Sequence, residues 1–457
     1  NYVIISMSQE APMNVNTHMI LRRSFLATFL ALTVAGLFGW TQMKNERAAL
    51  AEAPTRTIAL LPQSSLSSSA PLDMSAAIDA RMAMLERTVA VSFVSEPGKA
   101  PVSSFDISLK DHPLWITFNV KGNKATATLD VARLKQYLIS YPPQGIPEPQ
   151  SCILLSSWTD DDGVVRAQTD CIAKSGYLYN VDALAHDIAD AFEHAADTVE
   201  YILTAVPAVV TDPTNGSAMP MKLLATGHSS FEGSGLSRKA NVRKGLNERV
   251  HNVLVPADTV FSFNDTLGIV SINRGWQMAL TIFEGANLRP APGGGICQVS
   301  TTTYRAALAA GLPIVQQKSH SLYVTYYEKF GVGQDATIFP GKQDFQFKND
   351  TGGPLLIQAY NDGDEAFVRI YGTDDERTVA ITGPYFGKTA PKDLLEDGKI
   401  LRNNEIGWVR TVTMPGGEPK REVFIARYTA IPKTLSSRWE LTTIITRGDA
   451  TKVVAER

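Results

Sequence analysis

The sequence has no long run of charges of one sign and almost no net charge. Its 457 residues include 43 basic and 46 acidic side chains, interspersed along the chain, which gives a formal net charge of −3. A nucleic-acid-binding surface needs an excess of basic residues, so this composition gives no reason to expect a nucleic-acid partner. A hydrophobic fraction of 44% over this length is ordinary for a globular protein and is enough for two or three domains.

One uncharged apolar run lies near the N-terminus. Residues 24–40 contain no charge and follow Arg22 and Arg23, which mark the side that stays cytoplasmic. We favour a signal anchor that crosses the membrane through 24–40; the alternative is a removed signal peptide, with Ala49–Ala51 as the cleavage pattern. In both cases residues 1–51 are a cytoplasmic stub and the signal, and the rest is extracytoplasmic, membrane-anchored or secreted.

Cysteine is scarce, with three residues in the whole chain. Cys152 and Cys171 flank an acidic turn at residues 160–163, and a hairpin folded there brings them opposite each other. Outside the cytoplasm such a pair is typically oxidised, so a disulfide is expected, with two buried thiols as the alternative. Cys297 is then left unpaired, which raises the question of a reactive thiol.

The pattern along the chain predicts an α+β, multi-domain protein. Residues 52–90 indicate a flexible linker and a short helix, and residues 91–215 indicate a module of strands and helices. A mixed strand-and-helix domain is expected over 216–372, followed by a β-rich C-terminal module over 373–457.

No metal site or cofactor is expected. One helix repeats His and Asp every four residues, but its apolar residues repeat about 200° away, so the polar stripe faces solvent. The stripe consists of Asp182, His186, Asp190 and His194. The segment GPYFGKT (383–389) is one residue short of a phosphate-binding loop and no helix follows it.

The segment GGGICQVSTT (293–302) carries the strongest chemical signal. A helix is predicted after it, ended by Gly311, so Cys297 falls at or just before the first helical turn. Unpaired amides and the helix dipole favour a thiolate there, and glycine N–H groups can form an oxyanion hole. The alternative is a packed thiol beside a tight turn.

A histidine on another element completes the minimum for nucleophilic acyl transfer. His320, in KSHSLYVTYY at the predicted start of a strand, is the expected base, and His228 is a rival. Either histidine is also consistent with a purely structural role. The groups expected to form an oxyanion hole or bind substrate are Gly294, Gly295, Gln298, Ser300 and Thr301.

Several segments, in this order, resemble the VanW domain, which is named for a vancomycin-resistance accessory protein of bacterial envelopes. They are FSFNDTLG, GGGICQVSTTTYRAALAAGLPIV, HSLYVTYY, GQDATIF and DFQFKNDTGGPLLI, and the resemblance as a whole extends over roughly residues 222–372. The upstream part, residues 91–210, more weakly resembles a peptidoglycan-binding module often found ahead of VanW domains. The tail is similar to the small modules that commonly follow.

The resemblance implies a chemistry for these residues. Some members of the family are linked to L,D-transpeptidation, in which a cysteine accepts a peptidoglycan stem peptide and passes it to an amine. Carried over by position, Cys297 is the nucleophile, His320 the base and Asp335 an orienting or structural acid. Family members tend to have a proline in the loop before this aspartate, which the YYEKFGVGQDAT of this chain lacks.

Two functions of different classes therefore stay open. One is a cysteine acyltransferase that acts on peptidoglycan stem peptides. The other is a non-catalytic accessory protein that binds peptidoglycan while partners do the chemistry. An enzyme needs a perturbed, accessible thiol, whereas a binding protein tolerates the change of Cys297 to serine.

Overall fold

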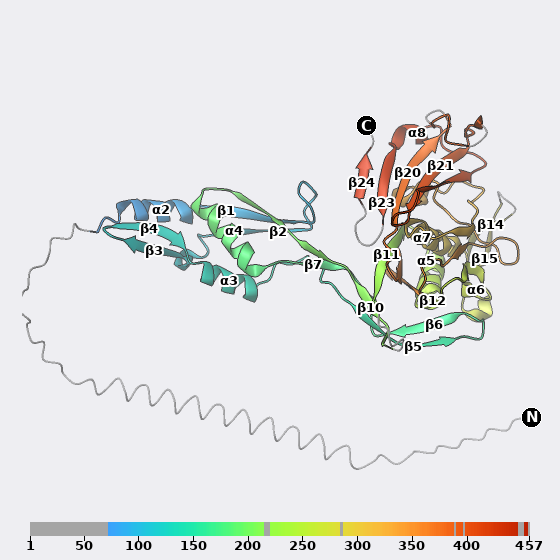
Figure 1. Ribbon diagram of the computed structural model, residues 1–457, viewed down its shortest axis with the longest axis horizontal. Helices are drawn as coiled ribbons and strands as arrows, with labels where there is room; N and C mark the ends of the chain where they lie inside the picture. Colours follow the sequence, from blue (N-terminus) through green and yellow to red (C-terminus); the bar gives the residue numbers. More distant parts are fainter. Residues whose placement is uncertain are drawn as a thin grey trace, which may run out of the picture. The chain divides into compact units, whose positions relative to one another are not determined.

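The computed structural model describes residues 72–213, 220–283, 287–387, 390–395, 398–446 and 452–455. The apolar stretch 24–40 and the pattern Ala49–Ala51 lie outside these ranges. Within them, we find no helix with the length and apolar character needed to cross a membrane. Helices and several separate sheets share the chain, which confirms the α+β, multi-domain prediction (Figure 1).

The first folded part is an α+β module on a three-stranded sheet. Strand β1 is central, with β2 antiparallel on one side and β8 parallel on the other. Asn180 caps helix α4 by accepting from the amides of Asp182 and Ala183, and α4 buries Leu184 and Ile188. The elements are α2 (Ser75–Leu85), β1 (Thr88–Val94), β2 (Ser103–Ser108), η1 (Pro113–Trp115), β3 (Ile116–Lys121), β4 (Lys124–Leu129), α3 (Val131–Ser140), β7 (Gly176–Leu178), α4 (Val181–Glu193), β8 (Thr198–Ile202) and β9 (Thr204–Val206).

A closed barrel follows, and it draws on both sides of residue 215. Its strand order is β10-β11-β19-β18-β12-β6-β5. The hairpin β5–β6 that carries Cys152 therefore shares one sheet with strands far later in the chain. Strand β12 pairs with both β6 and β18. The strands are β5 (Cys152–Thr159), β6 (Val165–Thr169), β10 (Val209–Thr211), β11 (Met221–Ser230), β12 (Val253–Val255), β18 (Leu355–Asp362) and β19 (Glu365–Gly372).

Helices pack on this barrel. Helix α7 (Ile296–Ala309) lies against β11 and β19, and Gly227 on β11 permits this, because a Cβ there would lie 2.0 Å from the Thr302 carbonyl oxygen. Helix α5 (Leu236–Lys244) continues into the π-helix η3 (Gly245–Val250), where the helix ends. After Val250 the chain turns and enters strand β12.

Short elements surround α7. A three-stranded sheet has the order β13-β17-β16, and β14 and β15 form a separate hairpin. The bounds are β13 (Val260–Ser262), α6 (Phe263–Leu267), η4 (Ile272–Arg274), β14 (Met278–Phe283), β15 (Asn287–Pro292), β16 (Ile314–Gln316), η5 (Thr325–Phe330) and β17 (Gln346–Lys348).

The C-terminal part is a five-stranded sheet of order β22-β21-β20-β23-β24. It shares one hydrophobic core with α7 and the barrel, because Trp408 and Tyr428 pack in the same cluster as Val299. Arg410 of β21 is buried and donates to the carbonyls of Leu308 and Leu312 around the end of α7. The elements are β20 (Thr378–Phe386), β21 (Glu405–Thr413), β22 (Lys420–Arg427), α8 (Leu435–Arg438), β23 (Thr442–Thr446) and β24 (Lys452–Ala455).

Candidate functional site

Three consecutive glycines place Cys297 in the first turn of α7. Gly293 and Gly295 have φ values of +80° and +106°, which side-chain-bearing residues rarely adopt. A Cβ on Gly294 would lie 2.4 Å from the carbonyl oxygen of Ala279. The turn therefore needs glycine at each position, and it ends where the helix begins at Ile296, one residue before the half-buried thiol.

The start of this helix offers two unused amides. Within the described part of the chain, neither Gly295 nor Cys297 donates its backbone N–H to any acceptor, whereas the neighbouring amides of Gly294 and Ile296 do. Free N–H groups and the positive end of the helix dipole favour a negative charge at this point. The arrangement suits both a thiolate and the oxyanion that forms when a thiolate attacks a carbonyl.

His320 and Asp335 lie next to the thiol. The His320 Nδ1 is 2.5 Å from the Asp335 Oδ2, which also accepts from the backbone amide of His320 at 2.8 Å. Both side chains are buried. With Nδ1 held by the carboxylate, the imidazole has its Nε2 left for Cys297; the two residues line the same cavity, and each shifts the pKa of the other. This is the geometry of a cysteine nucleophile, a base and a group that orients the base.

The three groups shift one another's pKa values. Burial alone would raise the pKa of Cys297, but the hydrogen bond and charge of His320 more than offset it, and the pKa lies below the ordinary thiol value. Burial opposes protonation of His320, yet its hydrogen bonds to Asp335 and Cys297 raise its pKa to about 10. Burial likewise opposes ionisation of Asp335, but the His320 hydrogen bond lowers its pKa. These shifts favour the thiolate–imidazolium form of the Cys297–His320 pair over its neutral form, beside an ionised Asp335.

Tyr428 adds a further contact from the C-terminal sheet region. Its buried hydroxyl donates to the Asp335 Oδ1 at 2.5 Å, so both carboxylate oxygens are occupied. The adjacent backbone is also tied to the histidine segment, since the Thr429 amide donates to the Ser321 carbonyl at 2.7 Å. The predicted strand at His320 is wrong: residues 317–320 form a coil that these contacts hold in place.

The loop before Asp335 is fixed without the proline that the family pattern has. Arg305, buried on α7, donates to the carbonyls of Tyr327, Gly331 and Gln334. Burial of this guanidinium lowers its pKa to about 10, so it remains charged at neutral pH. The Arg305 guanidinium donates to three carbonyls of the loop, so it holds the loop backbone in place without the proline.

The expected substrate-binding residues divide into two groups. Gly295 lines the cavity at Cys297. Ser300 and Thr301 do not; they are fully buried, and they bond the backbone of Ala336 next to Asp335, Ser300 donating to its carbonyl and Thr301 accepting from its amide. They therefore position the acid.

Gln298 and Gly294 also lie behind the cavity wall. Gln298 is fully buried; its Oε1 accepts from Arg238 and its Nε2 donates to the Ser229 hydroxyl. The Gly294 carbonyl accepts from Asn241 at 3.0 Å. Neither residue is on the surface that a ligand reaches, because the helix buries them against α5 and β11.

His228 does not reach Cys297. Its Nε2 is 2.7 Å from the Glu365 Oε2, and its ring packs between Phe330 and Phe367. It is not among the residues that line the cavity. Of the two candidate bases, His320 is therefore the one at the thiol.

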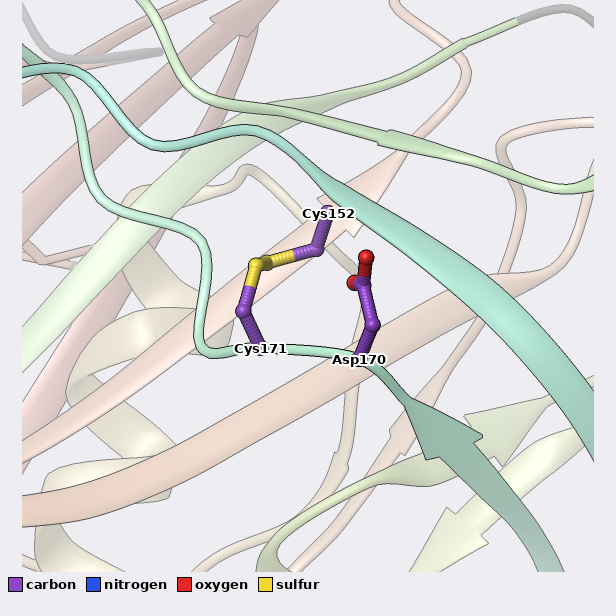
Figure 2. A group of neighbouring side chains, drawn as sticks. All are labelled: Cys152, Asp170 and Cys171. Carbon is purple, nitrogen blue, oxygen red and sulfur yellow. A yellow bond between two sulfur atoms is a disulfide. The ribbon is translucent and has the colours of Figure 1, made fainter. Parts of the chain in front are cut away.

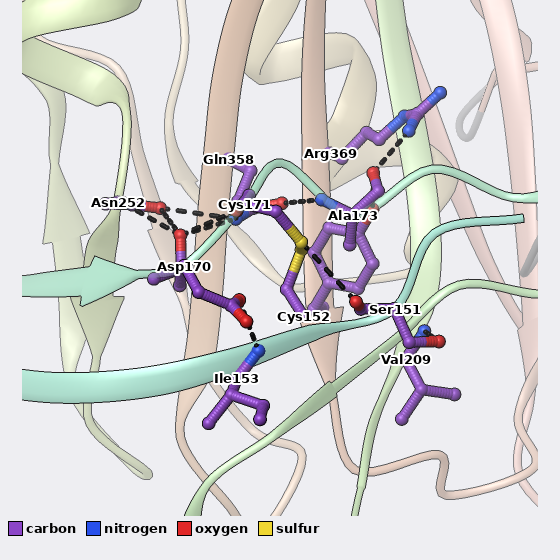
Figure 3. The surroundings of a disulfide bond; sticks show 12 residues. Ser151, Cys152, Ile153, Asp170, Cys171, Ala173, Val209, Asn252, Gln358 and Arg369 are labelled. Atoms are coloured by element: carbon purple, nitrogen blue, oxygen red, sulfur yellow. Dashed lines mark hydrogen bonds between the residues drawn. A yellow bond between two sulfur atoms is a disulfide. The ribbon is translucent and has the colours of Figure 1, made fainter. Parts of the chain in front are cut away.

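The other two cysteines are joined in the structure. Cys152 and Cys171 form a disulfide with a Cα–Cα distance of 5.4 Å (Figure 2). The neighbouring Asp170 accepts from the Ile153 amide at 2.7 Å, and Gln358 of β18 donates to the Cys171 carbonyl (Figure 3). The two sulfurs and the carboxylate lie close together, but bonded sulfurs are not thiolate ligands, so this group is a structural brace. Cys297 is the free cysteine.

A cavity of about 280 Å³ opens at Cys297 and His320. This is near the lower end of ligand-binding pockets, about 300 Å³. Its wall also includes Thr337 and Ile338 from the segment after Asp335, and Leu280 and Ile282 from β14. The thiol is therefore open to a small ligand or to part of a larger one.

Comparison with known proteins identifies the part of the chain that holds this site. The family described as VanW like protein matches residues 237–371. These residues are a VanW-like domain. The sequence resemblance is thereby confirmed, and VanW-like proteins are related to the bacterial cell envelope.

A curated relative supports the same family. The uncharacterized protein YoaR of Bacillus subtilis (strain 168) is 38% identical over 144 residues, which are 32% of this chain and 46% of YoaR. This chain thus spans about half the length of that relative. No solved structure matches the chain.

The matched VanW-like region contains the thiol, the imidazole and the carboxylate, but not every residue of the site. Tyr428 lies beyond its end at residue 371, in a strand-rich segment with no local signal for a site residue. Arg238 lines the cavity and lies within the matched residues. Its sequence does not mark it as a site residue, because SRKANVRK contains several equivalent cations.

Proposed function

We propose that the VanW-like domain is a cysteine acyltransferase of L,D-transpeptidase type that acts on peptidoglycan stem peptides. The observation that carries the proposal is the placement of Cys297 and His320 on one cavity, with Asp335 bonded to the histidine and two free amides at the start of α7. The family relation supplies the cell-envelope setting.

In the acylation step, the Cys297 thiolate attacks the carbonyl carbon of a stem-peptide amide. A C–S bond forms, the oxyanion accepts from the amides of Gly295 and Cys297, and the C–N bond then breaks. The proton on the Nε2 of His320 passes to the leaving amine. The products are a thioester on Cys297, a free amine and a neutral imidazole.

In the transfer step, an acceptor amine attacks the thioester carbonyl and gives one proton to His320. The C–S bond breaks, a new amide forms, and the thiolate–imidazolium pair is restored. Asp335 keeps its charge throughout and holds the ring in one orientation. Water in place of the amine would give hydrolysis of the stem.

The remaining parts of the chain receive roles consistent with this proposal. Residues 24–40 anchor or export the protein, so that the domain lies in the cell envelope. The module over 91–215 binds peptidoglycan and brings the VanW-like domain to its substrate. The disulfide between Cys152 and Cys171 fits an oxidising compartment.

The experiment is incubation of the protein with purified muropeptides, followed by mass spectrometry of protein and products. The wild type is expected to form new peptide bonds or shortened stems. His320→Gln is expected to lose this activity, and the matched variant His228→Gln, outside the cavity, is expected to keep it. Unchanged muropeptides together with retained binding would instead favour the non-catalytic accessory role.

A further inference from the structure

The cavity wall carries two basic side chains and no carboxylate. Its lining includes Arg238 from α5 and Lys318 from the segment before His320, and it includes no aspartate or glutamate. A cavity lined by charge of one sign concentrates ligands of the opposite sign.

Arg238 is held only by neutral groups. Its guanidinium donates to the Ser234 hydroxyl at 2.6 Å, to the Gln298 Oε1 at 2.7 Å and to the Tyr326 hydroxyl at 3.1 Å. It also lies 4.7 Å from the Tyr326 ring centre. No ion pair joins it to a carboxylate in the described part of the chain.

Other cations of the same helix show the contrast. Lys239 and Arg243 both pair with Asp364, away from the cavity. Partial burial of a lone charge is unfavourable, and a carboxylate partner offsets that cost. Arg238 instead keeps its charge uncompensated, while the fully buried Gln298 fixes its orientation.

The position of Arg238 relates it directly to the nucleophile. A Cβ on Gly295 would lie 2.8 Å from the Arg238 Cγ and 3.4 Å from its Nε. The side chain therefore crosses the start of α7 at the residue that supplies one of the free amides, two residues before Cys297. Exposed Lys318, on another wall, likewise has no ion pair within the described ranges.

From these contacts we infer that the cavity contains an anion subsite, and that Arg238 binds a free carboxylate of the acyl donor close to its scissile carbonyl. The naming of the ligand as an acyl donor rests on the proposed function; the anion subsite does not. The guanidinium suits a carboxylate, since its Nε–H and one Nη1–H are not used by these three contacts and each can donate a charge-assisted hydrogen bond. Lys318 adds attraction without fixing geometry.

Two alkylating reagents of nearly the same shape test the subsite. The Cys297 thiolate displaces iodide from iodoacetate or iodoacetamide and forms the same C–S bond with either reagent. Only iodoacetate carries a carboxylate. The ratio of their rate constants, measured without reductant and compared with the ratio for N-acetylcysteine, reports the preference for an anion. We expect the ratio for Cys297 to be higher.

Variants assign the preference to Arg238. Arg238→Gln is expected to lower the ratio by about fivefold or more, the scale on which local charge changes association rates. Arg238→Lys keeps the charge and is expected to keep most of the preference. Arg243→Gln removes one charge from the same helix outside the cavity and is expected to leave the ratio unchanged. Lys318→Gln provides an independent, smaller decrease.

An equal ratio in the wild type and Arg238→Gln would overturn the inference, as would an equal decrease in Arg243→Gln, which would indicate only a general surface field. The result is separable from the proposed function. A preference for iodoacetate that depends on Arg238, in a protein that forms no acyl adduct, would keep the anion subsite and reject the transferase. An acyl adduct on Cys297 without a preference for iodoacetate would keep the transferase and reject the anion subsite.

Discussion

Replacement of His320 by glutamine removes the charge that holds Cys297 as a thiolate. Glutamine keeps polar atoms in the space but cannot become a cation. Burial, which raises the thiol pKa, is then opposed only by the weaker hydrogen bonds of Ile338 and Thr337. We therefore expect the pKa of Cys297 to rise in this variant.

The size of the effect follows from the thiolate fraction. A free thiol of pKa about 8.5 is only about 0.3% ionised at pH 6, and each unit of pKa lowering multiplies that fraction by about ten. A less basic thiolate is also less nucleophilic, with a Brønsted slope of about 0.4–0.5, so the net gain is about three- to fourfold per unit. Loss of His320 should therefore reduce alkylation at pH 6 by about three- to fourfold for each unit by which the pKa of Cys297 rises.

The assay is the rate of alkylation by neutral iodoacetamide across pH 6 to 8. The wild-type rate should rise less steeply over this range than that of His320→Gln, because the pKa of Cys297 is lowered and that of His320 is raised to about 10. The rate for His320→Gln should rise steeply, approaching about tenfold per pH unit. His228→Gln should behave as the wild type. A wild-type rate that rises as steeply as that of His320→Gln would refute the thiolate–imidazolium pair.

Two further changes test the framework around the site. Tyr428→Phe removes a buried donor to the charged Asp335 and should lower the free energy of unfolding by about 1.5–3 kcal/mol. An unchanged urea midpoint would show that this hydrogen bond does not stabilise the fold. Reduction of the Cys152–Cys171 disulfide, whose residues are 19 positions apart, should lower it by roughly 2–4 kcal/mol. The alkylation rate of Cys297 should stay the same after reduction. A changed rate would contradict the interpretation that the disulfide is independent of the Cys297 site.

Local sequence signals were enough to locate the proposed nucleophile. Three glycines, a cysteine and a helix ended near Gly311 are features of one short segment, and the structure has α7 over Ile296–Ala309 with Gly311 at φ +73°. The hairpin with Cys152 and Cys171 at its ends is likewise a local pattern, an acidic turn between two apolar runs. Such features depend on neighbours in the chain, so they can be predicted without knowledge of the fold.

Contacts between distant segments could not be predicted in the same way. The bond from Tyr428 to Asp335 joins residues 93 positions apart, and that from Arg238 to Gln298 joins residues 60 apart. Ser300 was expected to bind substrate, but it is buried and donates to the backbone carbonyl of Ala336. Whether a residue on a helix is buried depends on the segments that pack against that helix. The barrel pairing of β6 with β12 is of the same kind.

The most direct test of the acyltransferase is the acyl adduct itself. Wild-type protein is incubated with stem peptide in the absence of an acceptor amine, and its intact mass and peptide map are then measured. We expect a stem-peptide thioester on Cys297 of the wild type that disappears when an amine is added. Cys297→Ser should form very little adduct, and Cys297→Ala should form none. An adduct on another residue, or product formation that persists in Cys297→Ala, would contradict it.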